Sequence, residues 1–227
     1  MLYIVATPIG NLEDMTFRAV RILKEVEYIF AEDTRVTRKL LQYYEISTKL
    51  DRYDEFTKMK RIPDMIKLLE EGKNIALVTD AGTPCISDPG YELVDAALKA
   101  GIQVSPIPGA SALTAATSVA GISLRRFCFE GFLPKKKGRQ TLFKRLVEEE
   151  RAVVLYESPF RLMRTLKDIE KYLGNRELVI VREITKIYEE ILRGKTRELL
   201  EKLENRTIKG EIVLIIKGVN DDVDDRD

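Results

Sequence analysis

The chain has 227 residues, of which 44% are hydrophobic and 33% charged, with 38 basic against 37 acidic side chains. It contains no histidine and only two cysteines, which excludes Ser-His-Asp and Cys-His triads, histidine-ligated metals and a four-thiolate zinc site. A general base must therefore be Asp, Glu, Lys, Tyr or Cys. Residues 221–227 are strongly acidic and leave residues 1–220 with a net charge of about +5, which weakly favours an anionic partner.

Hydropathy along the chain gives no sign of a membrane segment. The longest apolar runs, such as 2–6 and 212–216, are five residues long, whereas a membrane helix needs roughly 20. The N-terminal run has no basic region before it, so it is expected to be a strand and not a signal peptide. We therefore expect a cytoplasmic protein that makes no contact with a membrane.

In the first half of the chain, short β-rich runs alternate with longer amphipathic segments. This periodicity predicts strands at 2–6, 28–31, 74–79 and 102–106, and helices at 16–26, 36–44, 59–71, 91–100 and 110–120. Strands separated by helices indicate crossover connections, and hence a mostly parallel sheet.

The second half follows the same pattern less regularly. It predicts strands at 127–132, 152–156, 178–184, 187–193 and 212–217, and helices at 140–149, 159–173 and 196–203. Ser158 and Pro159 are typical of a helix N-cap and first helical residue. Because only Thr185 and Lys186 separate two of the strands, these strands are expected to form a hairpin in a mixed sheet.

These elements predict an α/β protein with two domains. The N-terminal domain, residues 1–115, would hold the mostly parallel sheet, and the C-terminal domain, residues 116–218, the mixed sheet. Residues 219–227 are predicted to be an acidic disordered tail, because they cannot bury enough apolar surface to fold.

Five turn-rich segments interrupt the elements, and most of them follow directly on a strand. They are residues 7–11, 80–84, 106–111, 130–138 and 156–161. In open α/β sheets the ligand binds beyond the carboxyl ends of the strands, so we expect these loops to gather at one cleft. Neither the dinucleotide-binding motif nor the P-loop motif occurs. The segment TDAGTPCISDPG at 79–90 instead suits a compact zwitterionic ligand, with Asp80 accepting from its amine or other cation.

The segment 125–145 is the most basic part of the chain, with eight basic side chains, one acidic side chain and four phenylalanines. Basic groups neutralise phosphates and aromatic rings stack on unpaired bases, as in proteins that bind single-stranded RNA. We expect the loop residues Lys135, Lys136, Lys137 and Arg139 to bind RNA. The alternative is a solvated helix face above core phenylalanines.

Eight ordered motifs carry a resemblance to a known family. They are LYIVATPIGNL at 2–12, AEDTR at 31–35, LVTDAGTPCISDPGYELV at 77–94, PIPGASAL at 106–113, FCFEGFLPKKKGR at 127–139, LYESPFRL at 155–162, REITK at 182–186 and KGEIVLII at 209–216. Together they resemble the tetrapyrrole-methylase superfamily. Within it, they resemble the family of bacterial methyltransferases that act on a ribose (cytidine) 2′-hydroxyl of 16S rRNA in the small ribosomal subunit.

The resemblance implies a homodimer that binds S-adenosylmethionine in a cleft between its two domains, needs no metal, and acts on 16S rRNA or the 30S subunit. Carried over to this chain, the cofactor-binding residues would be Ile9, Asp80, Ala81, Gly82, Thr83, Pro84, Ser111, Ala112, Tyr156, Ile184 and Gly210. Arg35 and Arg161, which lie in matching motifs, are added to the candidates for RNA binding.

A ribose hydroxyl is a weak nucleophile, so a base that takes its proton late in the reaction would help. The matching motifs supply the candidates Glu32, Asp33, Glu157, Glu183 and Lys186. Each of them can instead be an ion-pair partner, for example with Arg35 or Arg182. At Phe160, and again within 52–56, members of the resembled family often carry histidine, so this chain must do without those side chains.

Three functions remain open from the sequence. An rRNA 2′-O-methyltransferase accounts for the motifs and the basic loop. A methylase of a tetrapyrrole would share the fold, and its acidic substrate would suit Lys135–Lys137, but the first loop differs from the usual one of that branch. An RNA-binding module without activity would account for the basic loop but not for the segment around Asp80.

Overall fold

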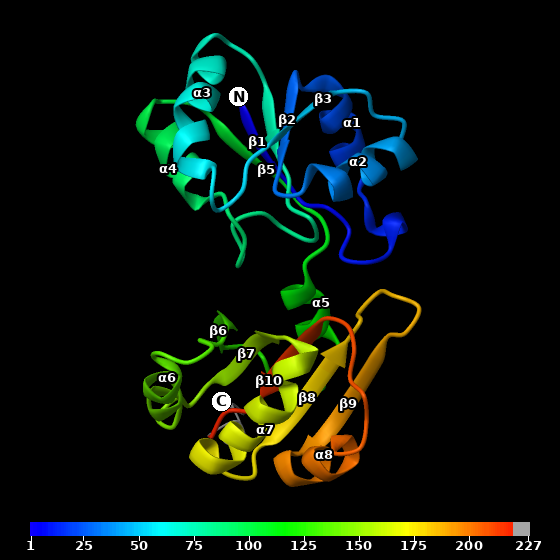
Figure 1. Ribbon diagram of the computed structural model, residues 1–227, viewed down its shortest axis with the longest axis vertical. Coiled ribbons are helices and arrows are strands. Elements are labelled where there is room, and N and C mark those ends of the chain that lie inside the picture. The colour runs from blue at the N-terminus through cyan, green and yellow to red at the C-terminus, as the bar shows by residue number, and fades with distance from the viewer. Residues whose placement is uncertain (220–227) are drawn as a thin grey trace, which may run out of the picture. The chain divides into compact units, whose positions relative to one another are not determined.

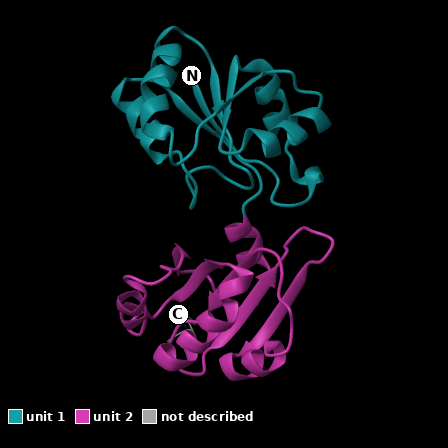
Figure 2. Cartoon of the chain, in the orientation of Figure 1, with its two compact units in different colours: residues 1–111 teal, residues 112–227 magenta. Residues whose placement is uncertain are grey.

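The computed structural model describes residues 1–219 and divides the chain into two compact units, shown in Figure 2. The first unit is Met1–Ser111, and the second begins at Ala112. The division falls directly before a helix, not after residue 115 as expected, because that helix packs on the sheet of the second unit. Apart from Val219, the tail predicted at 219–227 lies outside the described residues.

A five-stranded parallel sheet forms the centre of the first unit (Figure 1). Its strand order is β3-β2-β4-β1-β5. The strands are β1 (Leu2–Val5), β2 (Tyr28–Ala31), β3 (Lys49–Arg52), β4 (Ile75–Leu77) and β5 (Val104–Ile107). The helices are the 3-10 helix η1 (Leu12–Asp14), α1 (Phe17–Glu25), α2 (Thr34–Tyr43), α3 (Lys58–Glu70) and α4 (Tyr91–Lys99).

Helices cover both faces of this sheet, so both faces of its central strands are buried (Figure 1). Along β4, Ile75 and Leu77 pack with α3 and α4, whereas Ala76 packs with α1 and α2. Successive side chains of a strand point to opposite faces. A strand buried on both faces therefore reads as a continuous apolar run, which is why the sequence marks it clearly.

The second unit contains a mixed five-stranded sheet of order β6-β7-β10-β8-β9. Only β6 and β7 pair in parallel, and the other neighbours are antiparallel. The strands are β6 (Phe127–Phe132), β7 (Ala152–Glu157), β8 (Glu177–Arg182), β9 (Glu190–Lys195) and β10 (Ile212–Ile216). The helices are α5 (Ala112–Ser118), α6 (Arg139–Leu146), α7 (Pro159–Leu173) and α8 (Thr196–Leu203). One parallel and one mixed sheet confirm the predicted fold class.

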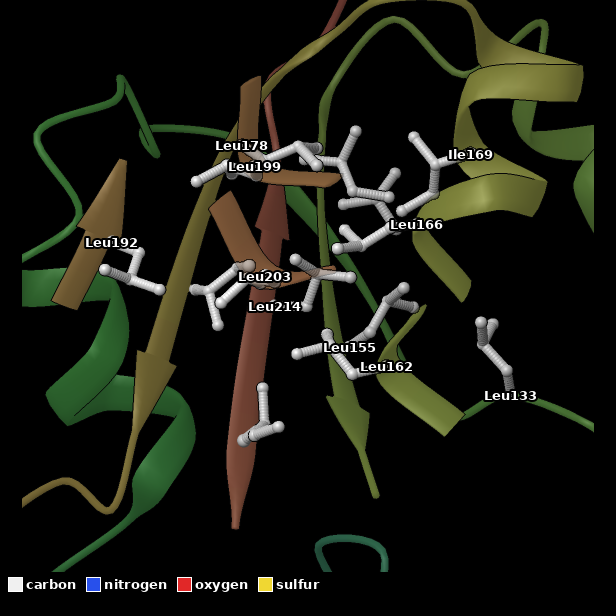
Figure 3. Close-up of a cluster of buried hydrophobic side chains, with 14 of the residues drawn as sticks. Leu133, Leu155, Leu162, Leu166, Ile169, Leu178, Leu192, Leu199, Leu203 and Leu214 are labelled. Atoms are coloured by element: carbon white, nitrogen blue, oxygen red, sulfur yellow. The ribbon is translucent and has the colours of Figure 1, made fainter. Parts of the chain in front are cut away.

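Leucines from several elements form the core of the second unit (Figure 3). Leu155 of β7 and Leu214 of β10 lie among Leu162 and Leu166 of α7 and Leu203 of α8. The opposite face of the same sheet packs on α5. Within residues 1–219, no helix is long and apolar enough to cross a bilayer.

Two sequence expectations need correction. Strand β3 was not expected, because its charged residues (KLDR) and partial exposure lack an apolar pattern. Strands β8 and β9 do pair antiparallel, but their connection spans residues 183–189 and is not the two-residue turn at Thr185 and Lys186. Ile187 and Tyr188 resemble strand residues in sequence, yet they are 95% and 74% exposed in this loop.

Candidate active site

Three loops of the first unit are joined to one another at the carboxyl ends of β1, β4 and β5. The backbones of Thr7 and Gly82 exchange two hydrogen bonds, with N···O distances of 2.9 and 3.0 Å. The Thr7 hydroxyl donates to the carbonyl of Thr79 at 3.0 Å, and the Thr83 hydroxyl donates to that of Ala110 at 3.2 Å. The expected gathering of loops thus occurs within the first unit, among the segments 7–11, 80–84 and 106–111.

Two glycines allow this close approach. A Cβ atom at Gly109 would lie 2.9 Å from the Cβ of Ala6. Gly82 has a φ of +92°, which favours glycine, and a Cβ atom there would lie 3.4 Å from the side chain of Ile9. Ile9, Gly82 and Pro84 are buried, so these three predicted cofactor residues pack inside the joined loops.

Asp80 and Ala81, in contrast, are exposed at this edge. A carboxylate oxygen of Asp80 accepts a hydrogen bond from the backbone N–H of Asp33 at 3.0 Å. Asp33 caps α2, where its carboxylate accepts from the N–H of Arg35 at 2.8 Å and pairs with the Arg35 guanidinium at 2.6 Å. The structure therefore brings the predicted residues Asp33, Arg35 and Asp80 together, with Asp80 exposed to solvent.

The carboxyl edge of the first sheet has a strongly acidic environment. Burial raises the pKa of Glu32, and the negative charges of Asp80 and Asp54 raise it further. Burial also raises the pKa of Asp80. Burial and the charge of Glu32 raise the pKa of Asp88 to about 6. A negative field of this kind favours a cationic ligand.

Sequence reasoning did not place Asp88 or Asp54 at the site. Asp88 could have been found from its position in the segment that follows Asp80, but nothing in the sequence shows that Asp54, after the unexpected strand β3, approaches Glu32. Within residues 1–219, no group of three or more cysteine, aspartate or glutamate side chains is arranged to hold a metal ion.

The five candidate bases differ in the hydrogen bonds and ion pairs that their side chains form. Asp33 is held by Arg35, and these interactions lower its pKa. Among the described residues, no hydrogen bond or ion pair is seen at the Glu32 carboxylate, which is half-buried with a raised pKa. This combination makes Glu32 the candidate best suited to accept a proton.

In the second unit, Glu157 is buried at the end of β7, and both oxygens of its carboxylate bind partners. Its carboxylate accepts from the backbone N–H of Ser158 at 2.7 Å and from the hydroxyl of Thr165 at 2.5 Å. It also pairs with Arg161 at 2.7 Å, and Arg161 donates to the carbonyl of Leu133 at 2.9 Å. Each charge neutralises the other inside the fold, and this pairing argues against Glu157 as a base and against Arg161 as an RNA-binding residue.

Arg139 also differs from its predicted role. It is buried, with only 3% of its surface exposed, although a basic loop was expected to present it to RNA. Its guanidinium pairs with Asp168 at 2.7 Å and donates to the Thr165 hydroxyl at 2.8 Å. A buried charge needs such partners, so Arg139 anchors the start of α6 against α7 and is not available to phosphates.

The lysines before Arg139 lie at the surface of the second unit. Lys135, Lys136 and Lys137 are all exposed, and no ion pair holds their ammonium groups within the described part of the chain. Tyr156, predicted to contact the cofactor, is half-buried on β7, with Phe129 and Phe132 at 5.0 and 5.5 Å between ring centroids.

Glu183 and Lys186 pair with each other in the loop between β8 and β9. The Lys186 ammonium contacts Glu183 at 2.8 Å and Glu211 at 2.9 Å. Burial lowers the pKa of Lys186, but these carboxylates outweigh it and raise the pKa overall. Lys186 thus stays protonated near neutral pH and cannot serve as a base.

Gly210 lies directly against this pair. A Cβ at Gly210 would lie 2.3–2.4 Å from the Glu183 side chain, so only glycine fits there. Ile184 is half-buried and packs against the cluster beneath α5. Ser111 ends the first unit, and Ala112 begins α5 in the second.

Comparison with known proteins identifies the family. The profile of the Tetrapyrrole (Corrin/Porphyrin) Methylases matches residues 1–200. The chain belongs to this family. Among curated relatives, the methylase described here is 49% identical over 217 residues to Ribosomal RNA small subunit methyltransferase I of Thermotoga maritima, covering 96% of this chain and 98% of that protein. Its identity to the protein of the same name from Halalkalibacterium halodurans is 51%, over 98% of this chain and 78% of that protein.

Solved structures of more distant methylases have the same fold. The methyltransferase CobJ matches with a TM-score of 0.71 at 20% identity, over 96% of this chain and 94% of the other. Cobalt precorrin-4 methyltransferase matches with a TM-score of 0.70 at 17% identity, over 95% and 94% of the two chains. At these identities the likeness extends to the tetrapyrrole-methylase fold alone.

Proposed function

We propose that this chain transfers a methyl group from S-adenosylmethionine to a ribose 2′-hydroxyl, that of a cytidine, in 16S rRNA of the small ribosomal subunit. The observation that carries the proposal is the identity of about half of all residues, over almost the whole chain, to proteins named Ribosomal RNA small subunit methyltransferase I. The tetrapyrrole methylases matched by structure share no more than a fifth of their residues with it, so they favour no tetrapyrrole substrate.

The first unit offers a fitting place for S-adenosylmethionine. Its sulfonium and ammonium groups suit the acidic edge formed by Asp80, Asp88 and Glu32. We propose that Asp80 accepts a hydrogen bond from the cofactor and that the joined loops, with Thr83 and Ala81, shape the pocket. Ser111, Ala112, Tyr156, Ile184 and Gly210 remain proposals from the resemblance.

When bound, S-adenosylmethionine supplies a methyl group on a positively charged sulfur, which is already an activated leaving group. The ribose oxygen forms a bond to the methyl carbon as the carbon–sulfur bond breaks, and the bonding pair goes to sulfur. We propose that the carboxylate of Glu32 takes the hydroxyl proton as this happens. The remaining task of the protein is to hold the reacting atoms in line, which needs no metal.

Substitution of Asp80 tests the cofactor site. Asp80→Asn removes the charge but keeps the shape and should weaken binding of S-adenosylmethionine by about 1–3 kcal/mol, because a neutral amide oxygen replaces the charged acceptor of the hydrogen bond. Isothermal titration calorimetry in the presence of a chelator measures this effect. Unchanged affinity in the variant would remove Asp80 from the site.

We propose that Lys135, Lys136 and Lys137 bind RNA phosphates. They are exposed and lie in a loop that can reach a partner without disturbing the core. Each neutralised phosphate releases counterions, so affinity for RNA should fall as the salt concentration rises.

We further propose that the enzyme is a homodimer in the cytoplasm, where ribosomal subunits are found. A light-scattering mass of one chain, 26.0 kDa, would contradict the dimer.

A methyl-transfer assay tests the proposed function. The protein is incubated with S-adenosylmethionine labelled in the methyl group and with 30S subunits, naked 16S rRNA or a tetrapyrrole precursor. We expect label in RNA from one or both ribosomal substrates and none in the tetrapyrrole. Label in the tetrapyrrole alone would support the small-molecule alternative, and RNA binding without any transfer would support a module that has no activity.

A further inference from the structure

A groove between α1 and α2 lies outside the loops described above. Its cavity volume is about 600 Å³. Met15, Val20 and Tyr44 form its floor and pack partly buried against the core of the first unit. Phe17 and Tyr43 stand at its rim with 97% and 60% of their surface exposed. No step of the proposed methyl transfer uses these residues.

The two aromatic residues at the rim lie at helix ends, Phe17 at the start of α1 and Tyr43 at the end of α2. Phe17 is the first residue of α1, which the Thr16 hydroxyl caps by accepting from the N–H of Ala19 at 3.1 Å. The ring of Tyr43 meets that of Tyr44 edge to face at 5.0 Å, and the Tyr44 hydroxyl donates to the carbonyl of Leu12. The contact with Tyr44 restricts the Tyr43 ring, so this ring loses less entropy when a flat partner stacks on it.

The charge of these helices indicates what fills the groove. Helices α1 and α2 together carry six basic side chains and one acidic side chain, although the whole chain is nearly balanced at 38 to 37. Arg21, Lys24, Glu25 and Glu45 line the groove itself, so its lining is balanced and the surplus of positive charge comes from the other basic residues of the two helices. Arg21 pairs with Glu25 while more than half exposed, and no ion pair holds Lys24 in the described part of the chain. Exposed rings beside cations suit a partner with both flat faces and negative charge.

We propose that the α1–α2 groove binds single-stranded RNA, with Phe17 and Tyr43 stacking on unpaired bases and Arg21 and Lys24 facing phosphates. Stacking on aromatic rings beside a cationic path is the usual chemistry of single-strand binding. Helix α2 has ten residues, so Tyr43 at its end lies roughly 15 Å from the cap Asp33 at its start. The groove thus holds a segment of RNA away from Asp80, and the inference goes beyond methyl transfer, although it rests on RNA being the substrate.

Double substitution of the rim tests the inference in the full chain. Fluorescence anisotropy with a short labelled oligouridine measures affinity for F17A/Y43A and for the wild type. We expect affinity at least about tenfold weaker in the variant, since each stacked base is lost. Tyr91→Ala is the matched control, because Tyr91 is a similarly exposed tyrosine (69%, against 60% for Tyr43) at the start of α4 in the same unit. The RNA affinity of this control variant should equal that of the wild type. Lys24→Ala should lower the slope of log affinity against log salt by about 0.7.

A second measurement does not depend on the variants. Photocrosslinking of a 4-thiouridine oligonucleotide to the wild-type protein, followed by peptide mapping, should mark the peptides that contain Phe17 and Tyr43. Wild-type RNA affinity in F17A/Y43A, together with crosslinks only elsewhere, would overturn the proposal. A change of oligomeric mass in that variant with unchanged RNA affinity would also overturn it and assign the groove to a second copy of the chain. Loss of RNA affinity in F17A/Y43A would support it even if no methyl transfer were found, so its failure and that of the proposed function are distinguishable.

Discussion

At the scale of single residues, Glu32 and Glu157 lie in similar sequence positions, each at or just after the end of a strand, but differ in environment. Glu157 is buried and bound by Ser158, Thr165 and Arg161. Glu32 is half-buried among other acids, and its burial and their negative charges raise its pKa. A carboxylate that is already paired gains little by taking a proton, whereas one in a negative field accepts a proton readily. The difference selects Glu32 as the proposed base.

Replacement of the proposed base should slow the chemical step far more than it weakens cofactor binding, because Asp80 and Asp88 keep most of the acidic edge. We expect Glu32→Gln to lower kcat by about 10²–10⁴, the usual contribution of a general base. The wild-type rate should rise with pH as Glu32 loses its proton, at a pH above the ordinary range for glutamate because its pKa is raised. The variant should lack this rise. Single-turnover rates across pH measure both effects, and a variant with wild-type kcat would exclude Glu32.

The raised pKa of Asp88 gives a prediction for stability. Its carboxyl titrates at about 6 in the folded chain, against an ordinary value of 3.8. Between these two pH values the folded state holds a proton that the unfolded chain has released, so Asp88 costs stability as pH rises through this range. Asp88→Asn removes the cost. Urea unfolding of both proteins should show that the advantage of the variant grows as pH rises from acidic to neutral, and an advantage that stays constant would refute this assignment.

At the scale of secondary-structure elements, the loop before α6 combines two kinds of basic residue that composition alone cannot separate. Lys135–Lys137 point to solvent, while Arg139, two residues further on, is buried against Thr165 and Asp168 of α7. The partners of Arg139 lie 26 and 29 residues away in sequence. Only the packing of α6 on α7 shows which of these cations is structural.

Single substitutions in this loop should separate stability from RNA binding. Arg139→Ala should lower the free energy of unfolding by about 3–5 kcal/mol, because the Asp168 carboxylate and the Thr165 hydroxyl then lose the guanidinium that they bind. Lys136→Ala should change it by less than about 0.5 kcal/mol while weakening RNA binding. Chemical denaturation and RNA titrations of both variants measure these effects. An Arg139→Ala protein of wild-type stability would mean that its buried pair contributes little.

The contact of Gly210, which lies just before β10, with Glu183 in the loop between β8 and β9 gives a second prediction at this scale. Gly210 and Gly72 have φ angles of +88° and +83°, but a Cβ would meet Glu183 only at Gly210 and nothing within 4 Å at Gly72. Alanine at either position should cost about 1–2 kcal/mol through backbone strain, and Gly210→Ala should cost more because Glu183 must move. Thermal unfolding of both variants measures the difference. Equal losses of stability in the two variants would show that the close approach of Glu183 to Gly210 adds nothing to the cost of the substitution.

At the scale of the whole molecule, the sequence predicts the fold well because apolar periodicity and helix caps mark most elements locally. Helix α7 begins at Pro159 and ends at Leu173 as the pattern predicts. The polar edge strand β3 gives no such signal. The exposed pair Ile187 and Tyr188 gives a false signal. At the site, the motifs locate the loops, but burial and pairing decide the role of each side chain, and these depend on contacts between distant segments.

The chemical position of the transferred methyl group tests the central claim most directly. 16S rRNA is isolated from 30S subunits after incubation with the protein and labelled S-adenosylmethionine, and it is hydrolysed in alkali. A methyl group on the ribose oxygen blocks cleavage at that nucleotide, because the free hydroxyl is needed to attack the adjacent phosphate. We therefore predict that the label is recovered in an alkali-resistant dinucleotide with a methylated cytidine ribose. Label recovered only in mononucleotides, as a base methylation gives, or no label in RNA at all, would contradict the account.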